Sequence, residues 1–178
     1  MTHLLKIAEG VEVAPLLAQL ETHPELPPDA QALRQTLPEP AVTRGKILAL
    51  EAEVAKLAQV EMPLRHFFAN GVYARELTIP AGTVVVGKIH KYAQINILSK
   101  GDISIATEQG VRRVQAPHTV VSPPGTKRVG YAHTETVWTT ISRTDETDLE
   151  LIEKELIAES FENYELFCRE AMRLKGTS

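Results

Sequence analysis

The sequence contains a single cysteine, no long apolar run and no run of basic residues, and each of these features excludes a class of protein. Cys168 cannot form an intramolecular disulfide or a cysteine cluster for a metal, which is typical of a reducing compartment. No apolar stretch approaches the roughly 20 residues of a transmembrane helix, and no signal-peptide pattern is present at the start. We therefore expect a cytoplasmic protein that does not insert into a membrane.

No excess of basic charge is present either. The formal net charge is −4, the pI is about 5.9, and no five consecutive residues are basic. This composition gives no indication of a nucleic-acid partner. At 178 residues, of which 43% are hydrophobic, the chain is long enough to bury one sizeable core. We expect a single β domain with helical additions.

The first zone, residues 1–69, reads as a helical arm. Its apolar residues fall at helical spacing in three pieces, 13–20, 30–37 and 46–60, which prolines separate. The third piece carries a narrow apolar stripe made of Ile47, Leu50, Val54 and Leu57. The stripe can pack on the chain's own sheet or against a second subunit, and the sequence leaves both open. The second arrangement gives the expected homodimer.

The second zone, residues 70–143, changes to short runs rich in β-branched residues, separated by clusters of Gly, Pro and Asp. Many short strands at this spacing predict an antiparallel β-barrel or sandwich. We expect strands at 72–79, 83–90, 94–99, 103–107, 111–116, 119–122, 128–133 and 136–142. The third zone, residues 144–178, is helical again, with Asp145 or Thr147 as N-cap, and we expect it to pack on the outside of the barrel.

A spaced motif begins at Gly82 and reads Gly82-x5-Lys88-x-His90-x3-Gln94-x6-Gly101. These glycines and intervals resemble the first motif of the cupin superfamily, usually written Gly-x5-His-x-His-x3 or x4-Glu-x6-Gly. The resemblance implies an RmlC-like double-stranded β-helix over about residues 70–143, with a small-molecule pocket inside the barrel. The chain also resembles bacteriophage-encoded cupin-domain proteins, which implies a location in the host cytoplasm.

The second cupin motif centres on Pro-x-Gly-x2-His, and the chain departs from it. Pro123 and Gly125 match, but Arg128 stands where the family has a histidine, and Ala132 stands where an asparagine is expected. In the first motif, Lys88 and Gln94 likewise replace metal ligands. The resemblance therefore indicates a cupin pocket without the usual set of metal ligands.

Alternation along a strand predicts which side chains share a face. If the strand is regular, the polar set Lys88, His90, Tyr92, Gln94 and Asn96 projects to one side, and the apolar set Ile89, Ile95 and Ile97 projects to the other. In one arrangement the polar set faces the barrel lumen and the isoleucines pack against outer helices. In the other, the polar set faces solvent and the isoleucines form the core.

Cationic side chains at ligand positions disfavour a metal. A protonated ammonium or guanidinium has no lone pair to donate, so Lys88 and Arg128 add positive charge where a cation would have to bind. We expect no cofactor and no metal, unless His66, His118 or His133 rebuild a site from unmatched positions.

The same charges favour a small anionic molecule such as a phosphorylated or carboxylated metabolite or a nucleotide, which the protein sequesters or senses. We expect Lys88, His90 and Arg128 to contact it, with orienting hydrogen bonds from Tyr92, Gln94 and Asn96. A rim role for Tyr73, Arg75 and Trp138 is open beside plain barrel packing.

Two other functions stay open from the sequence. An enzyme can use His90 as base and Tyr92 as acid, as in metal-independent isomerases, epimerases or lyases, and a rebuilt metal site would suit a dioxygenase. A phage structural or assembly protein would use the barrel as a scaffold and the helices for contacts.

Overall fold

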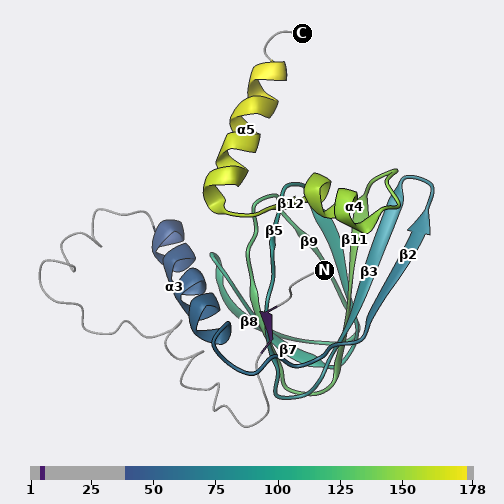
Figure 1. Ribbon diagram of the computed structural model, residues 1–178. Helices are drawn as coiled ribbons and strands as arrows, with labels where there is room; N and C mark the ends of the chain where they lie inside the picture. The colour runs from purple at the N-terminus through teal and green to yellow at the C-terminus, as the bar shows by residue number, and fades with distance from the viewer. Residues whose placement is uncertain (1–4, 7–38, 176–178) are drawn as a thin grey trace, which may run out of the picture.

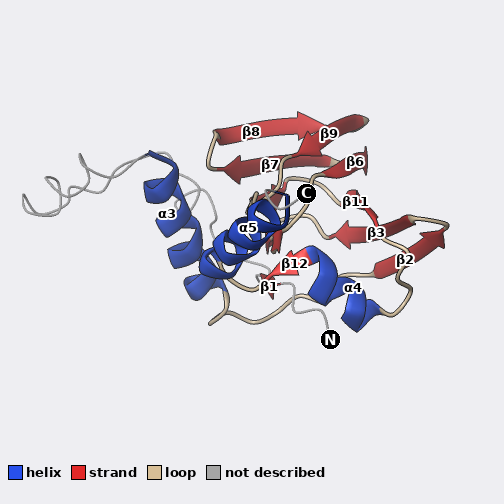
Figure 2. Ribbon diagram, turned by 90° about the horizontal axis from the view of Figure 1, so that it is seen from above, coloured by secondary structure: helices blue, strands red, loops and turns tan. Residues whose placement is uncertain are grey.

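Two five-stranded antiparallel sheets face each other in the computed structural model, which describes residues 5–6 and 39–175 (Figures 1 and 2). Sheet A has the order β1-β4-β10-β7-β8, and sheet B has the order β2-β3-β11-β6-β9. The strands of sheet A are β1 (Leu5–Lys6), β4 (Val84–Val86), β10 (Val129–Ala132), β7 (Asp102–Thr107) and β8 (Gly110–Gln115). Those of sheet B are β2 (Leu64–Ala69), β3 (Val72–Ile79), β11 (Thr136–Arg143), β6 (Gln94–Lys100) and β9 (His118–Ser122).

A third, two-stranded sheet pairs β5 (Ile89–His90) with β12 (Ile157–Ala158), and three helices complete the described part of the chain. The helices are α3 (Glu39–Val54), α4 (Leu149–Leu156) and α5 (Phe161–Lys175). The expected fold class, mainly antiparallel β with helical additions, is confirmed. Among the described residues, no helix has both the length and the apolar character that a membrane crossing demands.

The interior between the sheets contains a continuous apolar cluster at one end. Its buried members come from both sheets and from the segment before β2, and they are Met62, Leu77, Ile79, Val85, Leu98, Ile103 and Ala132. Alternation explains this packing, because every second residue of a strand points to the same side. Polar residues occupy the inward positions nearer the other end, where the candidate site lies.

The two glycines that bound the cupin-like motif both adopt a left-handed backbone. Gly82 has φ of 75° and Gly101 has φ of 98°. A side chain at Gly101 would also lie 2.5 Å from the carbonyl oxygen of Glu135. Only glycine fits this turn without strain, so this glycine is explained by the fold.

Helix α3 covers the outer face of sheet A. Ile47, Leu50 and Val54 are buried against Val84 and Val129 and their neighbours. The stripe is therefore occupied by the chain's own sheet, while Leu57 lies beyond the helix end and is 36% exposed. The homodimer stays a prediction, without the support that the stripe gave it.

Helix α3 also begins and ends earlier than the expected range of 46–60. Pro40 lies in its first turn, where backbone N–H groups have no partner inside the helix, so proline is tolerated there. The expected helical pieces 13–20 and 30–37 lie outside the described residues.

Strand β2 was not expected from the sequence. It pairs with β3 from Leu64 opposite Leu77 to Ala69 opposite Val72, so the β-structure begins before residue 70. The Asn70–Gly71 pair between the two strands is a strong hairpin signal that marks this connection.

The C-terminal zone divides into a cover and a projecting helix. Helix α4 lies over one end of the β-structure and buries Ile152 and Leu156 against Tyr73. Its N-cap is Asp148, whose carboxylate accepts hydrogen bonds from two backbone N–H groups, rather than the expected Asp145 or Thr147. Helix α5 extends away from the sheets, as Figure 1 shows.

Candidate functional site

A cavity of about 70 Å³ lies between the sheets, towards the end that α4 covers, and we refer to it as the lumen. The predicted residues Lys88, His90, Gln94, Asn96 and Arg128 all line it. They come from the β4–β5 connection, from β5, from β6 and from the segment before β10. The polar set therefore faces the inside of the barrel, the first of the two arrangements that the sequence left open.

Tyr92 is the one predicted ligand-binding residue that the structure places elsewhere. Strand β5 ends at His90 and β6 begins at Gln94, so the alternation expected across this stretch is interrupted. The Tyr92 side chain is 47% exposed, and its ring packs edge-on against Phe167 of α5 at 5.4 Å. The proposed acid–base pair of His90 and Tyr92 is therefore not brought together.

The isoleucines of the same stretch lie on the outer side, but helices do not cover all of them. Ile89 is buried, whereas Ile95 is 44% exposed on the outer face of sheet B. The expectation that the outer helices would cover these side chains is wrong for Ile95, because α3 packs on sheet A instead.

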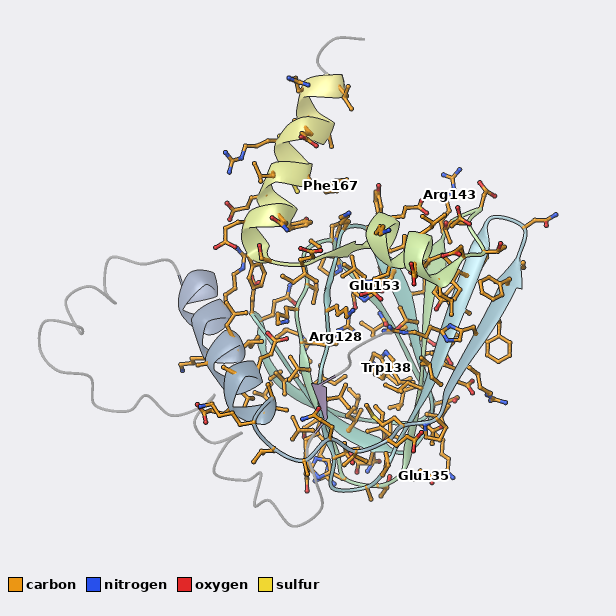
Figure 3. The ribbon with its side chains drawn as sticks, viewed as in Figure 1. Arg128, Glu135, Trp138, Arg143, Glu153 and Phe167 are labelled. Atoms are coloured by element: carbon orange, nitrogen blue, oxygen red, sulfur yellow. The ribbon has the colours of Figure 1, made fainter. Side chains whose placement is uncertain are left out.

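Three cations border the lumen. Arg128 donates from Nη2 to Ser122 Oγ at 2.6 Å, and burial lowers its pKa to about 10. Lys88 forms an ion pair with Glu153 of α4. Figure 3 shows Arg128 in the interior, with Glu153 at the end covered by α4.

Arg75 is the third cation, and it borders both the lumen and a smaller pocket of about 40 Å³ beneath α4. Burial lowers its pKa, although the negative charge of Glu153 acts in the opposite direction. No side chain or backbone carbonyl among the described residues accepts a hydrogen bond from its guanidinium. The sequence did not decide whether Arg75 lies at the rim of the pocket or packs in the barrel. Leu77 and Ile79 follow it by two and four residues on the same strand and are buried, so alternation places Arg75 on the inner face.

His90 lies among these charges without a carboxylate partner among the described residues. Burial, together with the positive charges of Arg75, Arg128 and Lys88, lowers its pKa to about 3. The imidazole is therefore neutral near pH 7, when it can donate one hydrogen bond and accept another. With this pKa it is a weak general base, because an effective base has a pKa near the working pH.

Asn96 and Gln94 differ in how their amides are used. The Asn96 amide donates to Ser122 Oγ at 2.9 Å and accepts from Trp138 Nε1 at 3.1 Å and from Thr140 Oγ1 at 3.0 Å. Asn96 therefore links three neighbouring side chains in the wall of the lumen. Gln94 is also buried, but its Oε1 has no hydrogen-bond partner among the described residues.

Of the other described histidines, His66 lines the pocket beneath α4 together with His90, whereas His118 and His133 line neither inner cavity. His66 Nδ1 contacts the Tyr73 hydroxyl at 2.7 Å, His133 Nε2 contacts Ser104 Oγ at 2.8 Å, and His118 is exposed. Within residues 5–6 and 39–175, no group of three or more His, Cys, Asp or Glu side chains is arranged to hold a metal. The lumen offers one imidazole beside three cations, and this donor set does not fit the divalent metal that the cupin resemblance implies.

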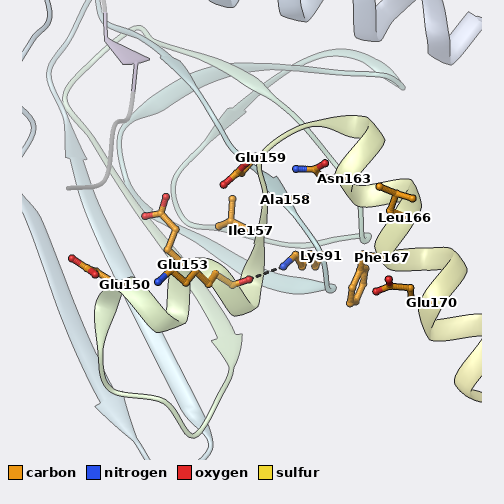
Figure 4. Close-up of a pocket in the computed structure, with 11 residues that line it drawn as sticks. Lys91, Glu150, Glu153, Ile157, Ala158, Glu159, Asn163, Leu166, Phe167 and Glu170 are labelled. Atoms are coloured by element: carbon orange, nitrogen blue, oxygen red, sulfur yellow. Dashed lines mark hydrogen bonds between the residues drawn. The ribbon is translucent and has the colours of Figure 1, made fainter.

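A second, wider groove of about 640 Å³ lies between α4, β12 and α5 (Figure 4). Lys91 borders it and is already engaged, since its Nζ donates to the Lys154 carbonyl at 2.6 Å and lies 5.7 Å from the Phe167 ring centroid. The lumen, rather than this groove, contains the buried polar groups that a ligand would satisfy.

Comparison with known proteins finds similarity to solved structures only, since no family model and no curated protein matches the chain. An acetylacetone dioxygenase from Acinetobacter johnsonii is 17% identical over 46% of this chain, with a TM-score of 0.40, and the match spans 59% of the dioxygenase. KdgF from Halomonas sp. is 17% identical over 51% of this chain and 88% of its own, with a TM-score of 0.43. A cupin-2 domain containing protein from Shewanella frigidimarina is 16% identical over 53% of this chain and 92% of its own, with a TM-score of 0.40.

Proposed function

We propose that the lumen binds a small anion without a metal. The observation that supports this most strongly is an excess of positive charge: Arg75, Lys88 and Arg128 border the two inner cavities, and Glu153 is the only carboxylate among the described residues that line them. Charged groups removed from water are costly unless a counter-charge is close. An anion in the lumen would supply that counter-charge.

The geometry of the cations favours a carboxylate or a phosphate. A guanidinium offers two parallel N–H groups that match two oxygens of such an anion, and Arg128 is already oriented by Ser122. Arg75 brings donors that no described residue uses. The anionic group would therefore lie between the two arginines.

The dimensions limit the size of the bound group. A water molecule takes up about 30 Å³ in the liquid, whereas the lumen measures about 70 Å³ and the pocket beneath α4 about 40 Å³. A group of a few heavy atoms, such as a short carboxylate or inorganic phosphate, fits this space. A whole nucleotide is too large for the lumen by itself.

Gln94 adds a second requirement on the ligand. Its buried Oε1 is an acceptor without a donor among the described residues, and leaving such a group unpaired typically costs about 1–3 kcal/mol. A hydroxyl beside the carboxylate would satisfy it. We therefore propose a small 2-hydroxy acid as the ligand class, and sequestration or sensing of that acid as the function.

Trp138 provides the means to test this proposal. It is the only tryptophan of the chain and lies 5.6 Å from the Arg128 guanidinium, so binding in the lumen should change its fluorescence. We expect glycolate and lactate to bind to protein treated with a chelator, acetate to bind more weakly, and Arg128→Met to lose binding at least about tenfold.

The matched control is Arg143→Met, because Arg143 is an exposed arginine at the end of β11. Phosphate titrations distinguish a general oxyanion site from a hydroxy-acid site. If none of these anions changes the fluorescence or the melting temperature, or if the purified protein carries one equivalent of a transition metal, the proposal is wrong. Catalysis and a scaffold role in a phage stay predictions from the sequence.

A further inference from the structure

The lumen has a second approach, on the side of the molecule between β8 and β9. A groove of about 390 Å³ lies there, and we refer to it as the side groove. It shares Ile105, Arg128 and Trp138 with the lumen, so the two spaces meet at these three side chains. The side groove is several times larger than the lumen.

The topology explains why the structure is open at this place. Strand β8 is the edge of sheet A and β9 is the edge of sheet B, and no hydrogen-bonded pairing joins the two strands in the described part of the chain. They follow each other in sequence, and Figure 2 shows them at the same side of the molecule. Because the two sheets separate here, inward-facing residues of both edges are accessible from solvent.

The lining of the side groove combines an apolar wall with cations at its inner end and its rim. The apolar part is formed by Ile105, Val114, Val120, Pro123, Pro124 and Trp138. Arg128 lies at the inner end, and Arg112 is an exposed arginine in the lining. The acidic residue of the lining, Glu108, is neutralised by Arg44 at 2.6 Å.

Such a lining is complementary to a molecule with an anionic head and an apolar body. Apolar surface gains roughly 25 cal/mol for each Å² removed from water, and an aromatic ring can stack on Trp138 in addition. A short acid that only fills the lumen would leave this wall exposed. Arg112 adds positive charge that draws an anion towards the opening.

We propose that the side groove receives the body of the ligand whose carboxylate is held in the lumen. This inference rests on the proposed function and refines its ligand class to 2-hydroxy acids with an aryl or branched alkyl body. Trp138 and Arg128 then contact the ligand at the junction, where the carboxylate meets the body.

The test is a series of acids that share one head, namely lactate, 2-hydroxyisocaproate and 3-phenyllactate, titrated by Trp138 fluorescence and by calorimetry. We expect affinity to increase along the series by at least about tenfold from lactate to 3-phenyllactate. Val120→Asn places a polar amide on the apolar wall without adding charge and should reverse that gain, while lactate binding stays within about twofold of wild type.

Ile95→Asn is the matched control, since Ile95 lies on the neighbouring strand β6, is 44% exposed on the outer face of sheet B and does not line the side groove. Val120→Ala serves if Val120→Asn does not fold, and should reduce only the 3-phenyllactate affinity. Lactate binding without tighter binding of 3-phenyllactate would overturn the side-groove inference and leave the proposed function standing. Failure of the whole series, lactate included, would overturn both.

Discussion

The Arg128 guanidinium lies over the indole ring of Trp138, 5.6 Å from its centroid, at the junction of the lumen and the side groove. One hydrogen-bond network holds both side chains. Ser122 accepts from Arg128, Asn96 accepts from Trp138, and Asn96 donates to Ser122. The protein itself therefore orients the arginine and the indole, which would reduce the entropy lost if an anion binds as proposed.

Replacing Asn96 with alanine should disconnect this network. Trp138 Nε1 and Thr140 Oγ1 would lose their shared acceptor in a buried place, so we expect the free energy of unfolding to fall by about 1–3 kcal/mol. Trp138 fluorescence should also shift in the absence of ligand. Asn163→Ala, an exposed position of α5, is the control for urea denaturation. Unchanged stability and an unchanged spectrum would show that the network does not hold the wall.

Arg75 should strengthen anion binding but lower the free energy of unfolding. Arg75 is half-buried, burial lowers the pKa of its guanidinium, and no described residue accepts a hydrogen bond from it. We expect Arg75→Met to raise the free energy of unfolding by about 1–3 kcal/mol and to weaken anion binding by at least about tenfold.

Arg65→Met is the matched control for that measurement. Arg65 lies on the neighbouring strand β2, with an exposed side chain paired to Glu76. It should leave binding unchanged, because Arg65 lines neither inner cavity. It should not raise the free energy of unfolding, because it removes the partner of Glu76, whose side chain is only 16% exposed. A loss of stability in Arg75→Met would mean that the guanidinium supports the fold, and the binding argument would then lose its main support.

Much of the lumen could be predicted from motif spacing and strand alternation. The glycine-to-glycine spacing predicted that Lys88, His90 and Gln94 line one cavity, and the second motif predicted that Arg128, from a distant segment, lines it too. The predicted position of Tyr92 was wrong because alternation holds only within an unbroken strand. The strand is interrupted between β5 and β6, where β5 pairs with β12 instead. That pairing depends on a segment more than 60 residues away, which local sequence does not show.

Arg75 and the side groove were harder to predict for a different reason. Inward positions of a strand usually carry apolar residues, and Arg75 is an exception on β3. Its role therefore depends on the residues that surround it in the fold. The groove depends on which strands form the sheet edges, and sheet order is a long-range property. Strand β2, in contrast, was within reach of the sequence through Asn70–Gly71.

Glu153 should compete with the anion for Lys88. Its carboxylate pairs with Lys88 from α4, with side-chain exposures of 36% and 23%. We expect Glu153→Gln to tighten lactate binding several-fold, because Lys88 then lacks a counter-charge, and to lower stability by less than about 1 kcal/mol. Glu150→Gln, an exposed position on the same helix, is the control. Weaker binding in Glu153→Gln would mean that Glu153 assists the ligand instead.

The neutral state of His90 predicts how stability depends on pH. The unfolded chain protonates this imidazole near its ordinary pKa of 6.5, whereas burial and three neighbouring cations lower the pKa to about 3 in the folded protein. Between these two values the unfolded state binds the additional proton. The free energy of unfolding should therefore fall as the pH falls through this window, by at most about 1.4 kcal/mol per pH unit.

His90→Gln isolates this contribution when urea denaturation is followed from pH 7 to pH 4. Hydrogen bonds from Arg113 and Gln115 lower the pKa of Asp102 from 3.8 to about 2. The stability that Asp102 contributes is therefore lost mainly below pH 4, outside the range of this measurement. The variant should show a flatter pH profile than wild type, and the exposed His118→Gln should keep the wild-type slope. Equal slopes in all three proteins would mean that the pKa of His90 is not lowered in the folded protein, so that the imidazole becomes a cation below its ordinary pKa of 6.5 and could contact an anion only there.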